Sequence, residues 1–139
     1  MADNGRIFRF VINQENPRKV DSFSVFADGD APGTPEYVAM TSPDNMDTSR
    51  YSLMVQEDTS NARIWNLNFS TEAWSVVASV NDPSGESSGI VDASEWFGHG
   101  SWILDVQSSD DVFSEFNPVT GVTSKLSSGQ LMLLNIPGS

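Results

Sequence analysis

The sequence predicts an all-β protein built from about two and a half four-stranded antiparallel β-propeller blades. Apolar and polar residues alternate over short segments, and turn-forming Gly, Pro, Asn and Asp residues separate those segments. The segments also recur as groups, which favours repeated blades. A β-sandwich of eight or nine strands remains the alternative, because it has the same alternation.

The first expected pair of strands is Arg6–Ile12 and Asp21–Phe26. Asp28-Gly-Asp30 follows and is typical of a tight turn. We interpret residues 1–33 as the outer half of a blade.

Residues 34–84 are expected to form one complete blade. Its strands run from the inner to the outer edge as Ser42–Ser49, Ser52–Gln56, Ala62–Phe69 and Trp74–Val80. Blades of about 40–50 residues with four strands are typical of propellers.

Residues 85–139 are expected to form a blade that lacks its outer strand. Three apolar segments supply its strands: Ser87–Ser94, Ser101–Val106 and Gln130–Ile136. The polar segment that holds Asp110, Asp111 and Glu115 and runs to Ser128 predicts a long loop.

Two matches support the repeat. Ala62-Arg-Ile-Trp65 resembles Gly5-Arg-Ile-Phe8, and Asp92-Ala-Ser94 repeats Asp47-Thr-Ser49 45 residues later. After an insertion at 95–100, Ser101-Trp-Ile-Leu-Asp105 takes the place of the strand that begins at Ser52. The predicted order is therefore the two outer strands of one blade, then all four strands of the next blade, then the three inner strands of a third.

This order leaves blades incomplete at both ends of the chain. Complete propellers have about four to eight blades, and unpaired strand edges promote association. We therefore expect either a piece of a longer protein or self-association through the open blade edges.

The charge excludes some partners. Seven basic residues stand against 19 acidic residues, a formal net charge of −12. Nucleic-acid binders need clustered Lys and Arg, so neither a nucleic acid nor an anionic membrane is expected. The chain has no cysteine, which excludes thiolate chemistry and disulfides.

The candidate metal ligands are carboxylates and an amide in short connecting segments. Oxygen ligands from several such segments are what Ca²⁺ requires, so calcium is the expected cofactor. The alternative is that these residues form turns or are simply solvated. The candidates are Asp44, Asn45, Glu57, Asp58 and Glu86.

No catalytic residue can be assigned from the sequence. His99 is the single histidine and lies between two glycines, so it lacks a second histidine or a cysteine for a zinc site. No Gly-x-Ser-x-Gly turn and no phosphate-binding Gly-rich loop is present.

Six stretches, taken in order, resemble one family, the PhoX-type alkaline phosphatases and related phytase-like bacterial propeller proteins. The resemblance covers nearly the whole chain and falls at the C-terminal end of that family's domain. The stretches are Ser42–Asn45, Leu53–Asp58, Ala62–Trp65, Glu86–Ile90, Trp102–Gln107 and Gly129–Leu134.

The resemblance implies a calcium-dependent propeller that hydrolyses phosphate esters and is periplasmic or secreted. It places Asp44, Asn45, Glu57 and Asp58 in loops at the metal end, and Glu86 at the glutamate of a Glu-x-x-Gly motif that ligates metal. The iron-bearing members use a cysteine, which this chain lacks. Two hypotheses follow: an incomplete piece of a calcium-dependent phosphoesterase, or a non-catalytic propeller module for scaffolding or self-assembly.

Overall fold

The computed structural model describes residues 4–81 and 85–137, with the side chains of 108–113 and 125–128 left aside. The chain divides into two compact units, Met1–Pro43 and Asp44–Ser139. The described residues have an all-β architecture, with three antiparallel sheets among them and none closed into a barrel. The predicted fold class is thereby confirmed.

The first unit is organised around a β-hairpin of β1 (Arg6–Ile12) and β2 (Val20–Asp28). Asn13 N donates to Lys19 O at 3.0 Å and closes the connection between the strands. The alternation of β1 places Phe8 and Phe10 on one face and the buried Ile7 on the other. One face of the hairpin is therefore strongly apolar and exposed.

The second unit contains a four-stranded meander in the order β3-β4-β5-β6. The strands are β3 (Pro43–Thr48), β4 (Ser52–Glu57), β5 (Arg63–Asn68) and β6 (Ala73–Ser79). All of β4 is buried, as expected for a central strand covered on both faces. Asp44 and Asn45 lie inside β3, in the segment Ser42–Ser49 predicted to form the first strand of the blade, and not in a connecting segment.

A three-stranded sheet in the order β7-β8-β9 completes this unit. Its strands are β7 (Gly85–Asp92), β8 (Ser101–Asn117) and β9 (Val122–Asn135). The predicted insertion after Ser94 contains a four-residue helix, α1 (Ser94–Phe97). Within residues 4–81 and 85–137, no helix has the length and hydropathy to cross a membrane.

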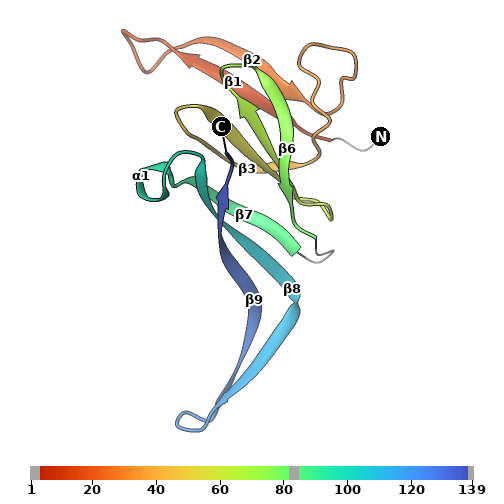
Figure 1. Cartoon of the computed structure of the whole chain (residues 1–139), viewed down its shortest axis with the longest axis vertical. Coiled ribbons are helices and arrows are strands. Elements are labelled where there is room, and N and C mark those ends of the chain that lie inside the picture. The colour runs from red at the N-terminus through yellow and green to blue at the C-terminus, as the bar shows by residue number, and fades with distance from the viewer. Residues whose placement is uncertain (1–3, 82–84, 138–139) are drawn as a thin grey trace. The chain divides into compact units, whose positions relative to one another are not determined.

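The long loop predicted from Asp110 to Ser128 is wrong. β8 continues to Asn117 and β9 starts at Val122, so the segment is a β-hairpin that runs beyond the end of β7 (Figure 1). The polar composition hid these strands because backbone pairing between two exposed strands requires no apolar alternation.

The two sheets of the second unit pack against each other, with β4 in contact with β7. Their shared core consists of Met54 and Ile64 from the first sheet and Ile90, Trp102 and Leu104 from the second. Neighbouring propeller blades and the two layers of a sandwich are both held by this kind of contact. The division into sheets of two, four and three strands is the one that the sequence predicts.

Candidate functional site

The predicted ligands Asp44 and Asn45 lie beside the first strand of the next sheet. Asn45 Nδ2 donates to Asp44 Oδ2 at 2.8 Å and reaches Ser88 Oγ in β7 at 3.5 Å. Asn45 therefore uses its amide donors to connect β3 with β7. Glu86 lies on β7 as well, two residues before Ser88.

Glu57 ends β4 with its side chain fully buried. Arg63 donates two hydrogen bonds to its carboxylate, from Nε to Oε2 at 2.8 Å and from Nη2 to Oε1 at 2.9 Å. Trp65 Nε1 donates to the same Oε1 at 2.8 Å. These charge-assisted bonds tie the end of β4 to β5. A metal-binding role for Glu57 stays a prediction, and its contacts here are those of a structural ion pair.

Glu86 lies where several negative charges converge. Its pKa is raised above its ordinary value of 4.5, first by desolvation and then by the charges of Asp58, Asp44 and Asp105. These four carboxyl groups come from β3, β7, β8 and the residue after β4. We call Asp44, Asp58, Glu86 and Asp105 the acidic edge.

Asp105 is the member of the acidic edge that the sequence prediction missed. It faces Gly89, which has a φ of +57°, and a Cβ at Gly89 would overlap with Asp105 Oδ1. The register between β7 and β8 also shifts between Ser88 and Val91. Glycine is therefore favoured at this position by its left-handed backbone conformation at the bulge, and a larger residue would also displace the Asp105 carboxylate.

Gln56 is a second residue that the sequence prediction missed. It is fully buried, and its amide bonds the backbone of β7 twice. Its Nε2 donates to Ser88 O at 3.3 Å, and its Oε1 accepts from Ile90 N at 3.2 Å. The signal in the sequence was a polar residue directly after the apolar run Leu53-Met-Val55.

The repeated residues Asp47 and Asp92 contact each other. Asp92 N donates to Asp47 Oδ2 at 2.8 Å, and Asp92 Oδ1 in turn accepts from Ser94 N at 3.0 Å. Side chains of the four-stranded sheet therefore bond the backbone of β7 at two places, through Gln56 and through Asp47.

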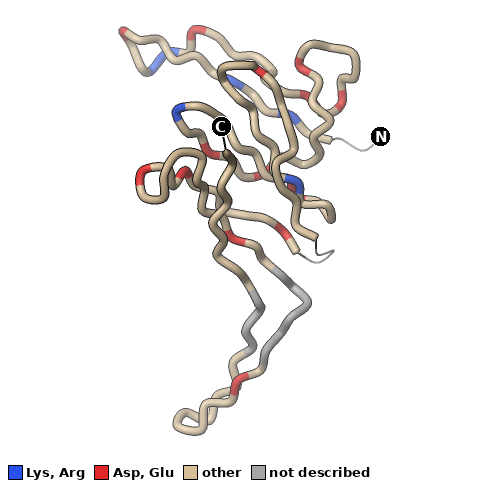
Figure 2. The backbone as a smooth tube through the Cα atoms, viewed as in Figure 1, with Lys and Arg blue, Asp and Glu red and all other residues tan. Residues whose placement is uncertain are grey.

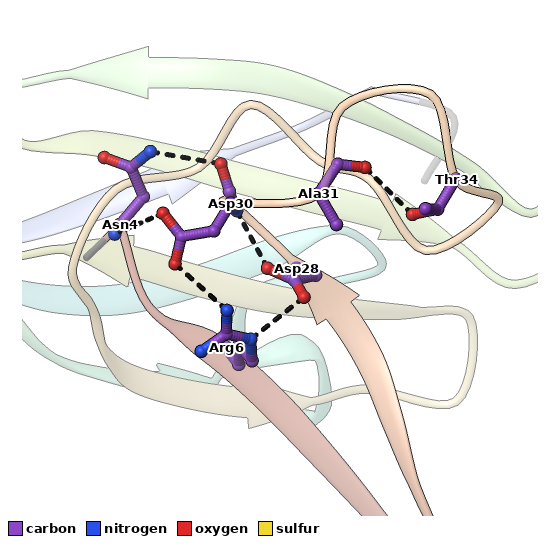
Figure 3. A network of polar contacts seen from close by, with 7 residues as sticks. Asn4, Arg6, Asp28, Asp30, Ala31 and Thr34 are labelled. Atoms are coloured by element: carbon purple, nitrogen blue, oxygen red, sulfur yellow. Dashed lines mark hydrogen bonds and ion pairs between the residues drawn. The ribbon is translucent and has the colours of Figure 1, made fainter. Parts of the chain in front are cut away.

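A separate polar network closes the turn after β2 in the first unit (Figure 3). Arg6 contacts Asp28 Oδ2 through Nε at 2.9 Å and Asp30 Oδ2 through Nη2 at 3.4 Å. Asn4 N donates to Asp30 Oδ1 at 2.8 Å, and Asn4 Nδ2 donates to Gly29 O at 3.1 Å. These carboxylates serve to hold the turn, which the sequence marked only as Asp-Gly-Asp.

The described titratable residues, those of the acidic edge included, form no recognisable metal centre. In the part of the chain that the structure describes, no three His, Asp or Glu side chains are placed to share a metal ion. Acidic positions are spread over the coloured part of the backbone tube (Figure 2), and acidic residues outnumber basic ones in the sequence. His99 packs edge-on against Tyr51, with ring centroids 4.4 Å apart.

The geometry therefore supports two roles. Buried polar groups can hold the two sheets together, and the acidic edge can attract a cation. Comparison of the chain with family models, with curated proteins and with solved structures found no match. The resemblance to the phosphatase and phytase-like propellers stays a prediction.

Proposed function

We propose that the chain is a non-catalytic structural module of a partial β-propeller, whose role is to pack antiparallel sheets face to face. The observation that supports this best is Gln56. A fully buried amide is costly unless both of its ends are bonded, and here both ends bond the backbone of the neighbouring sheet.

Glu57 supports the same function. Its carboxylate oxygens accept three bonds from Arg63 and Trp65. A group that sits in a buried network of this kind stabilises one particular arrangement of strands. The most buried carboxylate among the predicted ligands is thus engaged in holding the sheet.

The test is Gln56→Ala, compared with Gln130→Ala as the matched control at an exposed glutamine of β9. The first change leaves Ser88 O and Ile90 N without their amide partner, and we expect a loss of about 2–4 kcal/mol in unfolding free energy. The control is expected to change stability by less than about 0.5 kcal/mol. Equal effects of the two substitutions in urea unfolding would exclude the proposed role.

A second candidate is a calcium site at the acidic edge, as part of a phosphoesterase-like propeller. The raised pKa of Glu86 favours it, because converging carboxylates repel one another until a cation joins them. A bound Ca²⁺ would there polarise a phosphoryl oxygen. The site would be incomplete, since the remaining blades of a propeller are what preorganise such a centre.

Calorimetric titration with Ca²⁺ tests this candidate. Binding that weakens in Glu86→Gln, and is retained in the control Glu115→Gln on β8, would support it. Hydrolysis of a chromogenic phosphate ester with added Ca²⁺, lost in Glu86→Gln, would extend the role to catalysis. The absence of any calcium-dependent heat would rule the second candidate out.

A further inference from the structure

The packing of the two sheets in the second unit shows which face of a sheet receives the next one. Met54 and Ile64 belong to the face of the four-stranded sheet that contacts β7–β9. Gln56 is on that face too, because it pairs with Ile64 and bonds β7. We call the face that holds Met54, Gln56 and Ile64 the following-sheet face, because the next sheet along the chain packs on it.

The repeat places an equivalent face on the last sheet. When Ser101 is aligned with Ser52, Ile103 takes the position of Met54, and Asp105 that of Gln56. Leu131 pairs with Asp105 as Ile64 pairs with Gln56. The following-sheet face of β7–β9 is thus composed of Val91, Ile103, Asp105, Leu131 and Leu133, and we call it the outer face.

The outer face is mostly apolar, with Asp105 as its charged member, and it is open to solvent in the described part of the chain. Leu131 is 79% exposed, Leu133 53% and Val91 51%. Val91, Ile103 and Leu133 lie side by side across the three strands, because Ile103 pairs with both of the others. Contiguous exposed apolar residues of this kind mark interaction surfaces.

The hairpin of the first unit carries a face that matches it. Phe8 and Phe23 stack with ring centroids 5.3 Å apart, and Phe10 lies 5.0 Å from Phe23. With Val25, the partner of Phe8, they form what we call the hairpin face, whose members are 36–60% exposed.

The repeat also orients the hairpin face. Aligning Arg6-Ile-Phe8 with Arg63-Ile-Trp65 gives Ile7 the position of Ile64, which faces the following sheet. Phe8 is on the opposite side of the strand from Ile7. The hairpin face is therefore the side that receives a preceding sheet.

We propose that a second copy of this chain packs its hairpin face on the outer face of β7–β9, in a head-to-tail contact. This rests on the proposed sheet-packing function and continues, between copies, the mode by which β3–β6 packs on β7–β9. The contact is heterologous, so repeated association either closes a ring or extends into an open chain.

Charge favours head-to-tail contact over pairing of two like faces. Residues 44–139 carry 13 acidic and three basic residues, a formal net charge of −10, whereas Arg6, Arg9, Arg18 and Lys19 give the hairpin and its turn four of the chain's seven basic residues. Joining two outer faces would bring two strongly acidic units together. Joining an outer face to a hairpin face lessens that repulsion, because residues 6–28 carry four basic and three acidic residues.

Disulfide trapping tests the proposal directly, because the chain has no cysteine of its own. Phe10→Cys and Leu131→Cys chains are mixed under mild oxidation. We expect the mixed disulfide to form faster than either homodimer. Val119→Cys, at the exposed tip of the β8–β9 hairpin, is the control and should trap Phe10→Cys only slowly.

Sedimentation over the micromolar range gives the second measurement. We expect the cysteine-free chain to associate, and Leu131→Glu to weaken association about tenfold or more, because it removes an apolar side chain from the contact and places a second carboxylate beside Asp105. A monomer at all concentrations, faster trapping of like faces, or a disulfide within a single Phe10→Cys/Leu131→Cys chain would each overturn the proposal.

These failures are distinguishable from failure of the sheet-packing function. If Gln56→Ala destabilises the monomer while no mixed disulfide forms, the module packs its own sheets and the head-to-tail contact is wrong. If Gln56→Ala has no effect, the sheet-packing function itself has failed.

Discussion

Glu57 shows how a buried carboxylate can be mistaken for a ligand when only the sequence is known. Its side chain is fully buried, while that of Arg63 is 31% exposed. Breaking the pair leaves a partly buried guanidinium without its counter-charge. For Glu57→Gln we expect a loss of about 2–3 kcal/mol in unfolding free energy, below the range for fully buried pairs because solvent still reaches Arg63.

Urea unfolding of the purified protein measures this loss. Glu72→Gln is the matched control, because it makes the same chemical change at an exposed glutamate outside the acidic edge. The control is expected to stay within about 0.5 kcal/mol of the unchanged chain. A Glu57→Gln protein as stable as the control would show that the contacts with Arg63 and Trp65 contribute nothing.

Glu86 gives a prediction about pH. Its folded-state pKa is raised above 4.5 by desolvation and by three neighbouring carboxylates, so the folded state binds this proton more tightly than the unfolded state does. Stability is therefore lost as the pH rises from the ordinary carboxyl range through the folded pKa. Glu86→Gln does not titrate, so it should not show this loss of stability as the pH rises.

Thermal unfolding as a function of pH checks the prediction. The difference in Tm between Glu86→Gln and the unchanged chain should be small at pH values below the ordinary carboxyl pKa. It should become positive, in favour of the variant, at neutral pH. A difference that stays constant with pH would contradict the convergence of charge at the acidic edge.

The sequence predicted some site residues and missed others for identifiable reasons. Asp44, Asp58 and Glu86 were found because they are acidic and lie near expected turns. Asp105 was missed because it sits inside an apolar strand, and only the register with β7 brings it to Gly89. The partners of Glu57 depend on side-chain direction across a strand pair, which residue spacing does not specify.

At the level of elements, alternation predicted the strands that bury a face. β4 and β5 are recognisable because their apolar residues enter the core. The distal parts of β8 and β9 have no such signal, since Ser114–Asn117 and Val122–Ser124 are exposed. These distal segments are strands only because their backbones hydrogen-bond to each other, and amino-acid composition does not predict such pairing.

Hydrogen exchange distinguishes these two kinds of strand. Amides at 114–124 belong to a two-stranded segment without a buried face, and such segments are marginally stable in water. We expect them to exchange about 100-fold or more faster than the amides of β4 and β5, which open only with the core. Mass spectrometry of peptides from the two regions measures the ratio, and equal protection would indicate that another surface covers the hairpin.

On the scale of the whole molecule, charge is the property that composition predicts best. Acidic residues exceed basic ones by twelve, and most of the excess lies in residues 44–139. Self-repulsion of this size works against the folded state and against association of copies. Apolar packing within each unit must therefore outweigh the repulsion among these acidic residues.

Added salt should weaken the repulsion among the acidic residues. Raising NaCl from low to about 0.5 M shortens the Debye length to a few ångströms, so we expect the Tm to rise by about 2–5 °C, corresponding to about 1 kcal/mol for a chain of this size. Calorimetry at a fixed neutral pH measures the shift. A Glu95→Gln/Glu115→Gln chain, with two exposed charges fewer, should start from a higher Tm at low salt and gain less. A Tm that falls with NaCl would mean that ion pairs such as Arg63–Glu57 outweigh the net repulsion.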